Sequence, residues 1–313
     1  MKGVLCLGEA LIDFIPLDFE NTAYQKAPGG APANVSVGVS KLGGKAAFIG
    51  KVGNDVLGHF LKETLEGYGV HTQYMKLTDV ARTGLTFVTL EPTGERDFSF
   101  YINPSADRFL NKDEIDWNIF EEYRIFHFGS ISLIHEPSRT AALQAVKRAK
   151  EMDMLISYDP NLRIGLWDSE ERAKAEILGA LPYADIVKIS EEELTFLTGC
   201  NHMEEGISRF PENKLTIVTL GGDGCIFRYK DEIGRIPALP YKVVDTTGAG
   251  DAFVSGLLYC INESSKAFED HSLDEMASMI RFANVSGGLA VTKKGAMTGL
   301  PSLSEVQEIL KKA

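Results

Sequence analysis

The feature that most constrains the fold is a repeated alternation of short apolar runs with helix-like segments in the central part of the chain. The apolar runs have the length of buried strands and occupy residues 125–128, 155–158, 186–189 and 216–220. Between the first two runs, residues 137–152 carry alanine and valine at helical spacing. Strands that alternate with helices in this way predict an α/β fold with a mostly parallel sheet covered on both faces.

Polar residues and glycines cluster immediately after these runs. In a parallel sheet the carboxyl ends of the strands lie at one edge, and ligands bind in the crevice beyond that edge. The residues at these positions are Asp159, Asn161, Arg163, Ser190, Glu193, Thr219 and Gly221. We therefore expect the functional site to lie along this edge.

Two earlier segments have a different pattern. Residues 11–26 and 83–101 contain stretches in which apolar and polar residues alternate, and the turn residues Pro92, Thr93 and Gly94 divide the second segment. Such alternation is typical of strands with one exposed face. The pattern predicts a small β layer attached to the larger unit. The sequence has no internal repeat, low-complexity tract or flexible linker, which favours one domain with a β appendage.

Composition excludes several classes of partner. The 44 acidic and 32 basic side chains give a formal net charge of −12, which disfavours binding to nucleic acid or to an anionic membrane. The four cysteines, at positions 6, 200, 225 and 260, lack the spacing of a zinc site or a redox pair. They are expected to be buried free thiols in a reducing compartment. No apolar stretch approaches the ~18 residues of a membrane span, and we predict a cytoplasmic location.

Residues 245–251 form the first chemically informative motif. Small residues precede an apolar helix, so several backbone N–H groups are expected to point outward at the positive end of the helix dipole, which is an anion site. Asp251 places a carboxylate in the same region, where it can accept a proton from a hydroxyl while the amides stabilise a phosphoryl group. From the residues alone, an ordinary helix start in which Asp251 only complements the dipole is equally compatible.

Residues 29–34 form the second motif. Gly29 and Gly30 allow a small ligand to approach the backbone, and Asn34 offers hydrogen-bond donors and acceptors to sugar hydroxyls. An ordinary loop with Asn34 as a helix cap is the alternative. Other nucleotide motifs do not fit: residues 248–250 lack the third glycine of a dinucleotide fingerprint, and residues 43–46 lack the register and the Ser/Thr of a Walker loop.

The two motifs together resemble the two signatures of the ribokinase-like (PfkB) carbohydrate kinase family. The resemblance extends in the same order over almost the whole chain and is closest to the bacterial fructokinases. Further segments that carry it are residues 7–13, 48–58, 103–107, 126–130 and 158–163. Two positions depart from the family pattern: Ser190 stands where asparagine is usual, and Ile102 stands where related sequences favour arginine.

The resemblance implies a fold and an activity. The fold is a ribokinase-like three-layer α/β sandwich with a mostly parallel central sheet, in a single kinase domain over residues 1–313. Residues 12–28 and 84–104 would form a β lid, through which two copies would form a homodimer. The activity is transfer of a phosphoryl group from MgATP to a hydroxyl of fructose. The small-molecule partners are therefore a sugar and ATP.

The resemblance also assigns roles to single residues. Asp251 would be the general base, with backbone amides from Gly248, Ala249 and Gly250 around the transferred phosphoryl group. The sugar would be held by Asp13, Gly29, Gly30, Asn34, Phe100 and Arg163. The nucleotide would be bound by Lys188, Ser190, Thr219, Gly221, Gly222, Gly224 and Asn284. Glu193 would order the water shell of Mg²⁺, and Asp245 and Thr247 would contribute to a site for a monovalent cation such as K⁺.

Three alternatives remain at this point. The acceptor of the same kinase could be another small sugar, such as 2-keto-3-deoxygluconate or ribose. A non-catalytic, sugar-sensing protein could use the same fold, although it would have no need of Asp251 and its glycines. An oxidoreductase is disfavoured by the missing third glycine of the dinucleotide fingerprint.

Overall fold

The computed structural model describes residues 3–90, 96–210 and 213–312. Its centre is a nine-stranded sheet in the order β13-β12-β11-β10-β9-β8-β1-β4-β5. The strands are β1 (Gly3–Leu7), β4 (Ala46–Gly53), β5 (Met75–Thr78), β8 (Tyr123–Gly129), β9 (Leu155–Asp159), β10 (Ile186–Ser190), β11 (Leu215–Thr219), β12 (Cys225–Tyr229) and β13 (Glu232–Ile236). All pairs from β5 to β11 are parallel, and β12 and β13 add an antiparallel edge. The predicted mostly parallel sheet is confirmed.

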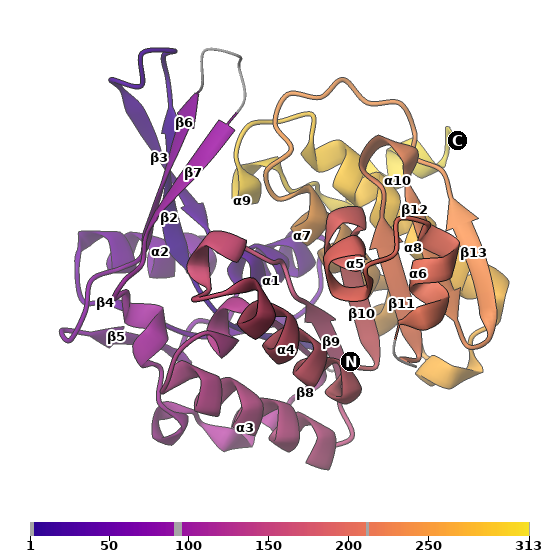
Figure 1. Ribbon diagram of the computed structural model, residues 1–313, viewed down its shortest axis with the longest axis horizontal. Helices are drawn as coiled ribbons and strands as arrows, with labels where there is room; N and C mark the ends of the chain where they lie inside the picture. The colour runs from indigo at the N-terminus through magenta and orange to yellow at the C-terminus, as the bar shows by residue number, and fades with distance from the viewer. Residues whose placement is uncertain (1–2, 91–95, 211–212, 313) are drawn as a thin grey trace.

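Helices cover both faces of this sheet (Figure 1). On one face lie α1 (Ala31–Lys41), α2 (Val56–Gly67), α7 (Ala249–Glu263) and α8 (Leu273–Ala290). On the other lie α3 (Ser138–Glu151), α4 (Glu170–Ala180), α5 (Glu191–Thr198) and α6 (Met203–Arg209). The short helices α9 (Ala296–Gly299) and α10 (Leu303–Leu310) follow α8. Because side chains alternate along each strand, every central strand supplies both apolar cores.

Short 3₁₀ turns connect many of these elements. They are η1 (Ala106–Phe109), η2 (Lys112–Glu114), η3 (Trp117–Glu121), η4 (Ile131–Leu133), η5 (Ile164–Leu166), η6 (Leu181–Tyr183), η7 (Gly221–Asp223) and η8 (Phe268–Asp270). Two of them, η5 and η7, follow the carboxyl ends of β9 and β11, where the sequence places its polar residues.

A second, four-stranded sheet projects from the body (Figure 1). Its strands are β2 (Leu11–Pro16), β3 (Tyr24–Gly29), β6 (Leu85–Leu90) and β7 (Arg96–Tyr101), in the order β3-β2-β6-β7. β2 and β6 are parallel, whereas β2–β3 and β6–β7 are antiparallel. The predicted β layer therefore forms from the expected segments. The turn predicted at residues 92–94 lies outside the described residues.

Two glycines set the starts of α1 and α7. Gly30, with a φ of 104°, precedes α1, and a side chain there would clash with the carbonyl oxygen of Glu9. Gly248, with a φ of 79°, precedes α7, and a Cβ there would lie 2.9 Å from the Cα of Ala296. Only glycine adopts such left-handed conformations without strain. Both helices therefore begin at positions that the sequence marks by a glycine.

The remaining structural expectations concern thiols and hydrophobic segments. Cys6, Cys200 and Cys225 are buried, Cys260 is partly buried, and all four are free thiols, as expected. Among the residues that the structure describes, no helix combines the length and the apolar character needed to cross a membrane.

Candidate active site

The amino-terminal ends of α1 and α7 meet at one hydrogen bond. Nδ2 of Asn34 donates to Oδ2 of Asp251 at 2.7 Å, although the two residues are 217 positions apart in the sequence. Both side chains are buried. Oδ1 of Asn34 is also buried and has no partner among the described residues. The two sequence motifs therefore form a single site, and the alternative that Asn34 is only a helix cap is not supported by its contacts.

Asp251 lies in the first turn of α7 in an environment that favours proton uptake. Burial raises the pKa of its carboxyl group to about 6, against the opposing effect of the hydrogen bond from Asn34. The first-turn amides of a helix have no intrahelical acceptor, and those of Gly250 and Asp251 belong to this group. The amide of Ala249 differs, because it donates to the carbonyl oxygen of Thr246 at 3.2 Å. A base with this pKa is largely ionised at neutral pH and close enough to neutrality to exchange protons.

The predicted sugar residues of the small sheet lie next to this pair. A side chain at Gly29 would clash with the carboxylate of Asp13, so glycine is required beside that carboxylate. Burial raises the pKa of Asp13 to about 6, and the positive charge of Arg163 opposes this shift. Asp13 pairs with Thr86 across the sheet, and Thr86 pairs with Phe100. Because directly paired residues point to the same face, Asp13 and Phe100 share one face of the small sheet.

A cavity of about 540 Å³ opens beside Asp251. Its lining includes Arg163, Lys188, Ser190, Thr219, Gly248 and Gly250, together with Asp251 itself. Nζ of Lys188 donates to Oδ2 of Asp159 at 3.1 Å, and both groups are buried. A Cβ on Gly250 would lie 3.0 Å from this Nζ. The ammonium group therefore lies directly against the start of α7, where an anion would bind.

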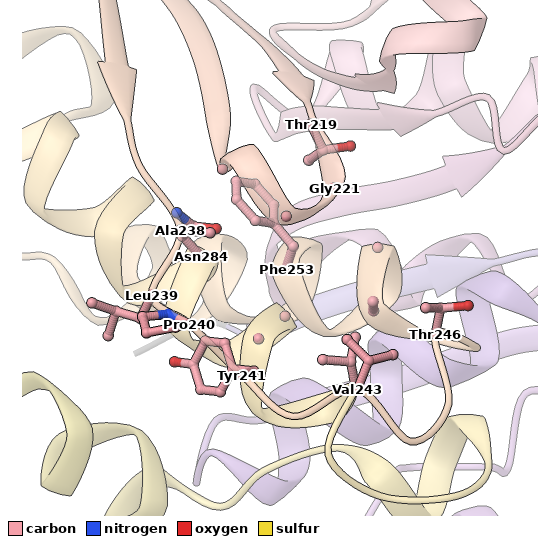
Figure 2. Close-up of a pocket in the computed structure, with 17 residues that line it drawn as sticks. Thr219, Gly221, Ala238, Leu239, Pro240, Tyr241, Val243, Thr246, Phe253 and Asn284 are labelled. Carbon is pink, nitrogen blue, oxygen red and sulfur yellow. The ribbon is translucent and has the colours of Figure 1, made fainter.

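A second cavity, of about 400 Å³, adjoins the first; Figure 2 shows the residues that line it. Thr219, Gly221 and Gly250 border both cavities. The predicted nucleotide residues Gly222, Gly224 and Asn284 also line it. Nδ2 of Asn284 donates to the carbonyl oxygen of Pro237 at 3.0 Å. The linings of the two cavities together suit a molecule with a bulky, mostly apolar end and an anionic end.

Comparison with known proteins identifies the family. The family model for pfkB family carbohydrate kinases matches residues 1–303. This chain belongs to that family. Fructokinase-1 of Zea mays is 47% identical over 318 residues, which cover 99% of this chain and 98% of the relative.

Solved structures give the same result for the fold. A fructokinase of Xylella fastidiosa with bound ATP superposes with a TM-score of 0.93 at 34% identity, covering 100% of this chain and 99% of that one. A fructokinase double mutant of Vibrio cholerae, bound to fructose, ADP and a potassium ion, superposes with a TM-score of 0.89 at 38% identity and covers 99% of each chain. The ribokinase-like fold expected from the sequence is therefore confirmed.

Within this pfkB fold, Glu193 caps the start of α5 and also binds the loop after β9, a contact that the sequence did not indicate. Oε1 accepts the backbone N–H of Leu162 at 2.6 Å, and Oε2 accepts that of Ser190 at 2.7 Å. The hydroxyl of Ser190 in turn accepts the N–H of Glu193 at 3.2 Å, which completes a capping box. Glu193 therefore joins the loop after β9 to the start of α5. Its predicted role toward Mg²⁺ remains a prediction.

Asp245 lies beneath the start of α7. Oδ1 accepts the backbone N–H of Thr247 at 2.9 Å, and Oδ2 accepts that of Gly295 at 2.9 Å. The carboxylate is buried. It therefore fixes the loop that leads into α7, and its predicted role toward a monovalent cation remains a prediction.

The sequence did not indicate some walls of the nucleotide cavity. Tyr241 and Val243, from the irregular segment between β13 and α7, line one side, and Phe253 of α7 lies on another (Figure 2). A side chain at Gly288 would clash with the ring of Tyr241, so this segment packs directly on α8. Pro237 and Pro240 are local signals in the segment, and they indicate an irregular backbone without assigning a contact.

Proposed function

We propose that this chain transfers the γ-phosphoryl group of ATP to a hydroxyl of fructose. The observation that carries the proposal is the position of Asp251. Asp251 accepts a hydrogen bond from Asn34 beside the sugar-facing residues, and it borders the cavity that leads to the nucleotide site. The fructokinase relatives support this choice of acceptor.

Each residue of the site has its own role in the proposed reaction. Asp13, Gly30 and Asn34 hold the sugar so that one hydroxyl faces Asp251. Asp251 accepts the hydroxyl proton as the oxygen attacks the phosphoryl group. The amides at the start of α7, together with the ammonium of Lys188, stabilise the charge on the transferred group. Arg163 reaches the same cavity from the loop after β9.

The donor set fits a magnesium ion that enters with the nucleotide. In the described part of the chain no three His, Cys, Asp or Glu side chains form a cluster that could hold a metal. Mg²⁺ usually keeps several waters and is bound by substrate phosphates with one or two carboxylates. We propose that Glu193 acts through such a water and that Asp245 and Thr247 contribute to a K⁺ site. The bound Mg²⁺ would neutralise phosphate charge.

The small sheet would act as a lid and as a dimer surface. Its inner face carries Asp13 and Phe100, so closure over the sugar would exclude water from the phosphoryl group. Its outer face carries Phe14 and Phe87, stacked with centroids 4.8 Å apart, and Tyr101, which is 63% exposed. Phe14 and Phe87 are half-buried, and a partly exposed aromatic cluster of this kind favours contact with a second copy of the chain. We also propose that residues 1–313 form a single kinase domain and that the protein is cytoplasmic.

A neutral ketohexose is the expected acceptor class. Forked arginines are the usual partners of a sugar carboxylate, and position 102 of the lid segment, where related sequences favour arginine, carries the buried Ile102 and offers no such group. The test is a coupled ADP-release assay with fructose, ribose, glucose and 2-keto-3-deoxygluconate under one set of conditions. We expect the highest kcat/KM for fructose. A preference of tenfold or more for the acidic sugar, about 1.4 kcal/mol, would refute fructose but not the kinase reaction.

A further inference from the structure

A third cavity lies beside the acceptor site and has no assigned ligand. Its volume is about 620 Å³, within the range of small-molecule sites. The end of the lid forms one wall through Phe100 and Asn103, and the loop after β9 forms the opposite wall. Arg163 borders both this cavity and the phosphate cavity next to Asp251. The third cavity therefore adjoins the active site at that arginine.

Two arginines face this cavity without a carboxylate partner. Arg108, from η1, and Arg163 both line it, and no described carboxylate lies within 4.0 Å of either guanidinium group. Nη1 of Arg108 donates to Oδ1 of Asn103 at 2.9 Å, a contact that leaves most of its five donors available. Asp168 also borders the cavity, but its carboxylate is paired with Arg172.

The local charge is opposite to that of the whole chain. The formal net charge is −12, yet Arg108 and Arg163 line this cavity with Asp168 as the one acidic side chain in its lining, and Asp168 is paired with Arg172. His135 also lines the cavity, and its pKa is lowered by burial and then by the positive charge of Arg108. Unpaired arginines around a concave surface are the usual recognition elements for phosphate or carboxylate groups.

We propose that this cavity binds the phosphate group of a phosphorylated sugar, with Arg108 as its main contact. A dianionic phosphomonoester matches two forked guanidinium groups better than a monoanionic carboxylate does. The cavity also offers apolar surface from Phe100 and Trp167, against which a sugar can pack. Phe100 and Arg163 are shared with the acceptor site, so a sugar phosphate bound here competes with fructose. The kinetic part of this inference rests on the proposed fructose kinase activity, whereas the binding part does not.

The test must separate this cavity from the ordinary phosphate position. Fructose 1-phosphate and fructose 6-phosphate are titrated calorimetrically into the full chain saturated with Mg²⁺ and a non-hydrolysable ATP analogue, whose phosphates fill the cavity beside Asp251. The variants are Arg108→Met and a matched control, Arg139→Met. Arg139 is partly exposed, lies on α3, and pairs with Glu176 outside the cavity.

We expect at least one sugar phosphate to bind the wild type and the control equally, and to bind Arg108→Met at least tenfold more weakly. Fructose affinity should change less than twofold in all three proteins. The same loss should appear in the inhibition constant against fructose. If Arg108→Met binds both sugar phosphates within twofold of the wild type, or neither binds the wild type, the inference is refuted.

Inorganic phosphate serves as the second probe. We expect it to bind more weakly than the sugar phosphates, because it cannot use the apolar walls. Equal affinity would refute the assignment to a phosphorylated sugar. Binding that depends on Arg108 in a protein that does not phosphorylate fructose would refute the proposed acceptor and leave the cavity assignment intact.

Discussion

Replacement of Asp251 by asparagine should abolish catalysis without loss of stability. Loss of a positioned general base typically lowers turnover by roughly 10²–10⁴. Asparagine has the same shape, and its side-chain oxygen can still accept the 2.7 Å hydrogen bond from Nδ2 of Asn34. The contact between α1 and α7 is therefore retained, and the variant differs from the wild type mainly in charge and basicity.

The effect of Asp251→Asn on stability can be estimated from the same pKa. Burial raises it from an ordinary 3.8 to about 6, a penalty of roughly 3 kcal/mol on the ionised folded state. The pKa of Asp251 is higher in the folded state than in the unfolded state. This penalty on folding stability is therefore absent below the unfolded-state pKa. It grows as pH rises to about 6 and is constant above that pH. At neutral pH the variant should therefore unfold at the same or a higher temperature than the wild type.

Thermal melts and steady-state turnover of Asp251→Asn, measured on the same preparation, test both points. Nucleotide affinity should remain within a few-fold of the wild-type value, because the nucleotide cavity is unchanged. A variant that melts normally and retains more than about a tenth of wild-type turnover would show that Asp251 is not the base. A clear fall in melting temperature would contradict the argument that its buried charge destabilises the fold.

Three further predictions concern the same site. The kcat/KM of the wild type should fall as pH decreases through about 6, because the carboxyl group of Asp251 is then protonated; a profile flat down to pH 5 would contradict this. Glu193→Gln should raise the Mg²⁺ concentration for half-maximal rate by roughly 10–100-fold, and an unchanged titration would restrict Glu193 to its bonds with the loops. Gly29→Ala should raise the KM for fructose on the order of tenfold through displacement of Asp13, whereas Gly67→Ala, where the added methyl meets nothing within 4 Å, should not.

Much of the fold could be predicted because its signals are local. The apolar run at residues 155–158 became β9 (Leu155–Asp159), and the helical spacing at residues 137–152 became α3 (Ser138–Glu151). The alternating segments became the small sheet for the same reason, since side-chain periodicity depends only on neighbouring residues. The sequence placed Gly30 and Gly248 before the two helices, whereas their positive φ angles are known from the structure.

Contacts between distant segments could not be predicted in this way. The family resemblance implied that Glu193 lies near the metal, but its hydrogen bond to the backbone of Leu162 depends on how the loop after β9 folds back. The wall formed by Tyr241 depends on packing against α8, for which the irregular segment carries no periodic signal. Arg108 gave no signal either, because an arginine in a polar loop is ordinarily a solvated side chain.

The position of Lys188 shows how the sheet itself contributes chemistry. On β10, Ile186 packs into the core beneath α7, whereas Val187 and Ile189 pack into the opposite core. Lys188 therefore points to the same face as Ile186, which is otherwise apolar, and its ammonium can only be buried there if charges compensate it. Asp159 supplies one such charge at 3.1 Å, and a single carboxylate leaves two of the three ammonium donors available. Lys188 and Asp251 line the same open cavity. In the proposed reaction those donors would meet the phosphoryl group there, which would account for a buried lysine that the stability of the sheet does not require.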